Sequence, residues 1–165
     1  MRNNFNAAAC IKGGPDAPRL SGVARFYQKN DGVLVEVRVS GLPKSNKTGF
    51  FALHIHEGGS CTGKEFADTK AHYNPESMPH PNHAGDLPPL LSFSGNAYMA
   101  VMTNRFTVND IIGRTVVIHS NPDDFYSQPS GDAGENSLRS YKKNIIQKNG
   151  LMNYFVKSLF FCKYV

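Results

Sequence analysis

All six histidines of this chain lie between residues 54 and 119, and five of them fall within thirty residues. Neutral imidazole is the commonest protein ligand for zinc and copper, and a nearby carboxylate adds an oxygen ligand that compensates charge. Such a concentration of ligand types therefore predicts a metal site. The residues concerned are His54, His56, His72, His80, His83, Asp86 and His119.

The first two histidines lie on a predicted strand. In residues 50–57 three large apolar residues alternate with Ala52, His54 and His56. Residues two apart on a strand point the same way, so the two imidazoles converge on one face while the apolar face turns to the core. An isolated pair of histidines would also fit a solvated strand face, but the four further histidines favour a shared site.

The chain up to residue 119 has the pattern of an all-β protein. Residues 33–39 alternate valine with other residue types after the hairpin signal of residues 30–32, and further strands are expected over residues 21–27, 97–103 and 115–119. Residues 58–89 have no sustained periodicity, and a loop of that length is usually functional or disordered. Its histidines favour a loop ordered by metal. Short strands at this spacing predict a sandwich or barrel.

Length and composition limit the remaining possibilities. The chain of 165 residues is long enough for one domain with a sizeable core. It has no run of about 18 apolar residues, so no membrane-spanning helix is expected. The first residues lack the apolar stretch of a signal peptide. The compartment therefore stays open: cytoplasmic if the chain begins here, periplasmic or extracellular if a leader is missing from the sequence.

The net charge of +5 is unevenly divided. Residues 1–135 carry 12 basic and 13 acidic side chains, whereas residues 136–165 carry 6 basic side chains and no acidic one. A basic tail could tether the chain to nucleic acid or acidic lipid. We favour the other interpretation, a tail that was not shaped together with the domain before it.

Five stretches, in order along the chain, resemble copper/zinc superoxide dismutases, in particular those of bacterial type. The likeness covers about residues 8–135, and five ordered motifs are far more specific than one. The resemblance implies an all-β, eight-stranded Greek-key β-barrel with a long metal-binding loop and a channel loop, its last strand doubtful. The stretches are Phe-Ala-Leu-His-Ile-His-Glu-Gly-Gly-Ser-Cys (51–61), His-Tyr-Asn-Pro (72–75), His-Ala-Gly-Asp-Leu (83–87), Ile-Ile-Gly-Arg-Thr-Val-Val-Ile-His (111–119) and Pro-Ser-Gly-Asp-Ala-Gly (129–134).

The resemblance also assigns ligands and activity. Each subunit would bind one copper ion and one zinc ion, with His72 bridging them, and Asp123 would hydrogen-bond ligands of both. The expected reaction converts superoxide into oxygen and hydrogen peroxide by redox cycling of copper, with His72 taking up and returning a proton. We expect no nucleic-acid or membrane partner, while a homodimer and a monomer both stay open. The implied ligands are His54, His56, His72 and His119 for copper, and His72, His80, His83 and Asp86 for zinc.

The resemblance ends at Glu135. Members similar to the preceding residues typically continue with Lys-Ile-Ala-Cys-Gly-Val-Ile, whereas residues 136–141 here read Asn-Ser-Leu-Arg-Ser-Tyr. Codons that encode the expected ending encode this hexapeptide when read two bases later. We therefore divide the chain into a superoxide dismutase-like domain, residues 1–135, and a divergent basic tail, residues 136–165, for which we hypothesise a reading-frame shift.

This departure bears on three residues. The resemblance places Cys61 as a disulfide cysteine whose usual partner is missing, and it places Arg139 near the basic residue that guides superoxide to copper. It also matches Cys10 to a buried thiol of the first strand. Two further hypotheses therefore stand beside an active enzyme: a copper/zinc-binding β-barrel with little or no turnover, and a poorly folded product of a damaged gene.

Overall fold

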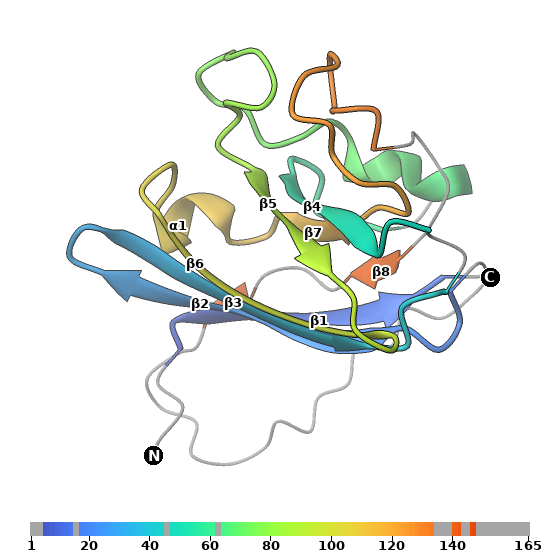
Figure 1. Cartoon of the computed structure of the whole chain (residues 1–165). Helices are drawn as coiled ribbons and strands as arrows, with labels where there is room; N and C mark the ends of the chain where they lie inside the picture. The colour runs from blue at the N-terminus through green and yellow to red at the C-terminus, as the bar shows by residue number, and fades with distance from the viewer. Residues whose placement is uncertain are drawn as a thin grey trace.

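The computed structural model describes residues 5–14, 17–44, 47–61, 64–133, 140–142 and 146–147. The regular structure of these residues is almost all β-strand, with one short helix and one 3-10 helix (Figure 1). The strands are β1 (Ala7–Gly13), β2 (Ser21–Lys29), β3 (Gly32–Ser40), β4 (Phe50–His56), β5 (Asp86–Leu91), β6 (Asn96–Thr103), β7 (Thr115–Ile118), β8 (Ser140–Lys142) and β9 (Ile146–Gln147); the helices are η1 (Lys64–Thr69) and α1 (Val108–Ile111).

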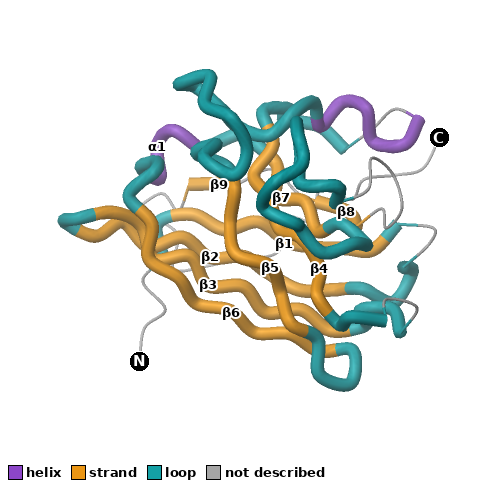
Figure 2. Tube along the Cα trace, turned by 45° about the horizontal axis from the view of Figure 1, so that its top comes forward, coloured by secondary structure: helices purple, strands orange, loops and turns teal. Residues whose placement is uncertain are grey.

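The strands form two antiparallel sheets. The larger has the order β6-β3-β2-β1-β8, with β9 also paired to β1, and the smaller has the order β5-β4-β7 (Figure 2). Strands β3 and β6 pair with each other although β4 and β5 lie between them in the sequence, which is a Greek-key connection. The predicted all-β class is confirmed. Within the described residues no ladder joins the two sheets, so the architecture is a sandwich rather than a closed barrel.

The core lies between the sheets and follows from the alternation of side chains along the strands. In β3 the side chains of Val33, Val35 and Val37 are fully buried, while the residues between them are at least partly exposed. In β4 the large apolar residues Phe51, Leu53 and Ile55 are fully buried in the same core. The sandwich thus fixes the orientation of β4, which carries two of the histidines.

The expected strands over residues 21–27, 33–39, 50–57, 97–103 and 115–119 are all present within one or two residues of the predicted ends. The expected loop over residues 58–89 was wrong at its end, because β5 begins at Asp86. The sequence does not predict this strand because it contains Pro88 and Pro89, and proline is rare in strands. In the structure they sit at a shift of register, where β5 pairs Leu87 with Leu53 and Leu90 with Phe51.

The prediction that Cys10 is buried was also wrong. Ala7, Ala9 and Ile11 of β1 face the core, so the side chain of Cys10 points to the other face of the sheet and is exposed.

The described part of the tail adds two short strands beside β1. Strand β8 pairs Lys142 with Ile11 and Ser140 with Gly13, and β9 pairs Gln147 with Ala7. The predicted domain boundary at residue 135 and the position of Arg139 lie outside the described residues. No helix in the described part of the chain is long and apolar enough to cross a membrane.

Candidate metal centre

The structure brings together all seven side chains that the sequence singled out as ligands. They form two groups in which the ligand atoms lie within 4.8 Å of one another, and His72 belongs to both groups. We call them the four-histidine cluster (His54, His56, His72 and His119) and the aspartate cluster (His72, His80, His83 and Asp86).

Regular backbone pairing positions most of the four-histidine cluster. His54 and His56 lie on β4, which pairs with β7 so that His54 is opposite Val117. The chain continues from β7 into His119, whose backbone N–H donates to the carbonyl of Ala52 at 2.9 Å. An isolated β-bridge between His56 and His72 brings the shared histidine against the same strand. These ladders fix the positions of the imidazoles before any ligand is bound.

The aspartate cluster has a carboxylate at its centre. Asp86 begins β5 opposite His54, and its Oδ1 lies 2.8 Å from Nδ1 of His72. Its Oδ2 lies 3.0 Å from Nδ1 of His80 and 3.2 Å from Nδ1 of His83. His80 Nδ1 is this close to the carboxylate without the alignment of a hydrogen bond. Three ring nitrogens and one oxygen thus face a common point, as they would around a cation.

A second carboxylate connects the two clusters from outside. Asp123 follows β7, with Oδ2 2.8 Å from Nε2 of His54 and Oδ1 2.9 Å from Nε2 of His80. The ring of His56 is held in a similar way, because its Nδ1 donates to the carbonyl of Lys70 at 2.7 Å. Such contacts fix which nitrogen of each ring faces the cluster. Asp123 therefore contacts one histidine of each cluster.

Two ring nitrogens show that the clusters suit a metal. Nδ1 of His54 and Nε2 of His72 are buried and lack a hydrogen-bond partner among the described residues. Both belong to rings whose other nitrogen is engaged, by Asp123 and Asp86 respectively. A buried polar atom without a partner is costly. A cation bound by the four-histidine cluster would satisfy both atoms.

The electrostatics favour the protonation states that bind cations. Burial lowers the pKa of His54 to about 4, although the bond to Asp123 opposes this, and burial also lowers the pKa of His83. Burial by itself would raise the pKa of Asp86 and of Asp123. Hydrogen bonds from histidines outweigh it, led by His72 for Asp86 and by His54 for Asp123, so the pKa of Asp86 is lowered and that of Asp123 falls to about 2. At neutral pH these two imidazoles are uncharged and both carboxylates are charged.

The clusters differ in access. All four residues of the aspartate cluster are buried, whereas His119 in the four-histidine cluster is half-buried. The four-histidine cluster therefore includes one partly exposed side chain, whereas every member of the aspartate cluster is buried.

Sequence reasoning missed two residues that hold the loop of the aspartate cluster. The Gln128 side chain accepts from the backbone N–H of His80 at 3.0 Å and donates to its carbonyl at 2.7 Å. Arg105 donates to three carbonyls of the same loop. Both are polar side chains that bind backbone far away in sequence, and no local pattern signals such contacts.

Two adjacent groups of possible metal ligands that share one histidine, held in a β-sandwich, are the arrangement expected of a binuclear metal site. The family model for copper/zinc superoxide dismutase matches residues 20–138. A copper/zinc superoxide dismutase of Aquifex aeolicus is 36% identical over 129 residues, covering 69% of this chain and 74% of the relative. One from Caulobacter vibrioides is 29% identical and covers 78% of this chain and 80% of the relative. The chain belongs to the copper/zinc superoxide dismutase family.

Proposed function

We propose that this chain is an active superoxide dismutase, with copper held by the four-histidine cluster and zinc by the aspartate cluster. The observation that carries the proposal is the sharing of His72, whose Nδ1 faces Asp86 and whose Nε2 lies buried on the other side of the ring. A single imidazole with one nitrogen turned to each cluster can link two ions.

The donor chemistry of each cluster supports this division. Three imidazole nitrogens and one carboxylate, all buried, match the closed tetrahedral shell of a structural zinc site. Four imidazole nitrogens with one half-buried member suit copper and leave access for a small substrate. Bound copper would supply the redox chemistry, taking one electron from a first superoxide and giving it to a second.

The residues of the chain have separate tasks in this proposal. His72 is the group that can hold a proton at Nε2, on the side of the four-histidine cluster, while its Nδ1, 2.8 Å from Oδ1 of Asp86, would be held on the zinc side. Asp123 orients His54 and His80 at once, so that a shift at one cluster is resisted by the other. Arg139 is proposed to guide the superoxide anion; it lies outside the described residues.

We also propose that the chain forms a homodimer. Phe50 of β4 and Leu91 of β5 are cross-strand neighbours with exposed side chains, and Phe93 just beyond them is 83% exposed. Exposed apolar groups that lie together commonly mark a protein interface. Light scattering on the purified chain should give twice the subunit mass, and F93K with L91K should give the subunit mass if this surface forms the dimer.

The activity is tested on the purified full-length chain supplied with copper and zinc. Turnover of superoxide with both metals bound is the expected result. Metals without turnover would instead support the alternative, a copper/zinc-binding β-barrel without catalysis. Insoluble protein that takes up neither metal would indicate a damaged gene product. A chain ending at Glu135, measured in parallel, tests what residues 136–165 contribute.

A further inference from the structure

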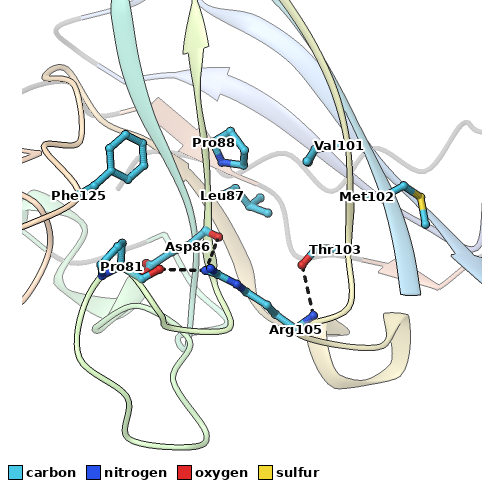
Figure 3. Close-up of a pocket in the computed structure, with 9 residues that line it drawn as sticks. All are labelled: Pro81, Asp86, Leu87, Pro88, Val101, Met102, Thr103, Arg105 and Phe125. Atoms are coloured by element: carbon cyan, nitrogen blue, oxygen red, sulfur yellow. Dashed lines mark hydrogen bonds between the residues drawn. The ribbon is translucent and has the colours of Figure 1, made fainter. Parts of the chain in front are cut away.

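Arg105 lies two residues after the end of β6, far along the chain from every ligand of the aspartate cluster. Its Nη1 donates to the backbone carbonyls of Pro81 at 2.9 Å, His83 at 3.2 Å and Asp86 at 3.4 Å. Figure 3 shows the guanidinium reaching back towards Pro81 and Asp86, while the backbone N–H of Arg105 donates to Oγ1 of Thr103 at 3.2 Å. One cationic group thus gathers three carbonyls of a single six-residue segment.

That segment supplies the aspartate cluster. Residues 81–86 include the ligands His83 and Asp86, and two of the three carbonyls that Arg105 binds belong to these ligands. His80 lies just before the segment and is held by Gln128. Residues 81–85 precede β5, and of the segment Asp86 alone pairs in the ladder with β4, so the position of His83 depends on such contacts. Hydrogen bonds from a charged donor are stronger than neutral ones, which suits this task.

We propose that Arg105 is a positioning residue for zinc, which holds the backbone of His83 and Asp86 so that their side chains face His72 and His80 before the ion arrives. This inference rests on the proposed function of the aspartate cluster. Groups outside the ligand set that orient ligands commonly contribute about 10–100-fold to metal affinity.

The direction in which zinc affinity changes when Arg105 is removed distinguishes a positioning role from an effect of its charge alone. A guanidinium close to a divalent cation repels it, so the loss of the charge alone would strengthen zinc binding. The loss of three backbone contacts would weaken zinc binding, because the ligands must then be ordered when the ion binds. Removing Arg105 therefore has opposite consequences under the two interpretations.

The surroundings of Arg105 leave room for a methionine or lysine side chain in its place. Arg105 lines an open pocket of about 300 Å³ together with Pro81, Leu87, Pro88 and Phe125 (Figure 3). A methionine or lysine side chain can occupy this space without displacing the core. Lysine keeps a cationic donor that can reach backbone carbonyls, whereas methionine keeps only the length of the chain.

The experiment compares R105M and R105K in the full-length, metal-free chain, with zinc affinity measured by competition with a chromogenic chelator. R19M is the matched control, because Arg19 is exposed and its loss changes the charge equally. We expect about 10-fold weaker zinc binding in R105M. R105K and R19M should stay within about twofold of the unmodified chain. Cobalt bound in place of zinc should show altered d–d bands in R105M and unaltered bands in R19M.

The controls separate this inference from the proposed function. Zinc binding by the unmodified chain is measured first, and its absence would contradict the function itself. With normal binding by the unmodified chain, equal or tighter binding by R105M would overturn the role of Arg105. Equal weakening in R19M would overturn it too. Circular dichroism verifies folding, and R105Q replaces R105M if the methionine variant does not fold.

Discussion

The four-histidine cluster and the aspartate cluster share His72 but are positioned in different ways. The first is held by strand pairing, since β4 carries two of its ligands and β7 leads directly into His119. The second takes His80 and His83 from an irregular segment that side chains hold in place, among them Arg105 and Gln128. Strand pairing uses backbone hydrogen bonds and so needs no particular side chains. A loop held by side-chain hydrogen bonds depends on the residues that make them. Substitutions outside the ligands should therefore affect the aspartate cluster more.

The largest effect should follow the loss of a ligand that belongs to the four-histidine cluster alone. In H119A, superoxide turnover should fall by at least about 100-fold, since loss of a mere orienting partner already costs a metal site 10–100-fold. Zinc affinity should be unchanged, because His119 is not part of the aspartate cluster. Turnover and zinc binding are measured on the same preparation, and loss of both together would mean that the clusters are not separable.

The converse substitution removes the central carboxylate of the aspartate cluster. D86A should weaken zinc binding by about 100-fold, because Asp86 contacts His72, His80 and His83. Copper should still bind, although His72 loses the partner of its Nδ1. Chelator competition for each metal measures this. D124A is the control, since the Asp124 side chain accepts hydrogen bonds from Tyr126 and Ser127 in its own turn. Equal loss in D124A would contradict the assignment.

These two substitutions concern residues that the sequence already indicated as ligands. The sequence could indicate some features of the site and not others, for physical reasons. Strand periodicity over residues 33–39 and 50–57 predicts which face of β4 carries His54 and His56, because the alternation of strand side chains is a local property. The enclosure of Asp86 among three histidines could be expected only from resemblance. Strand β5 was partly hidden by its prolines, and the contacts of Arg105 and Gln128 arise only once distant segments meet.

Acid should destabilise the metal-free protein through His54. Its pKa is lowered to about 4 in the folded chain from 6.5, so the unfolded chain binds more protons between these values. The free energy of unfolding should therefore fall as pH drops from about 6.5 to about 4, by on the order of 2 kcal/mol, and this contribution should level off below about 4. Urea titrations at each pH measure it. H54Q should show a shallower slope, and an equal slope would exclude His54 as the cause.

The smallest effect should come from the clamp on His80. Gln128 makes two hydrogen bonds with the backbone of His80, at 3.0 Å and 2.7 Å, and at the lower end of the usual range each contributes about 0.6 kcal/mol. Q128A should weaken zinc binding by roughly 5–10-fold and leave copper binding unchanged. S127A, one residue away, bears on Asp124 instead and serves as control. If Q128A changed copper affinity and not zinc affinity, the four-histidine cluster would be the more sensitive of the two, which contradicts the comparison.

The central claim is that one imidazole, His72, joins two metal sites. Copper in the four-histidine cluster with cobalt in place of zinc tests it by electron paramagnetic resonance, because paramagnetic ions that share an imidazole couple magnetically. We predict that cobalt suppresses the copper signal in the unmodified chain. An unchanged copper signal in protein that holds both metals would contradict the account.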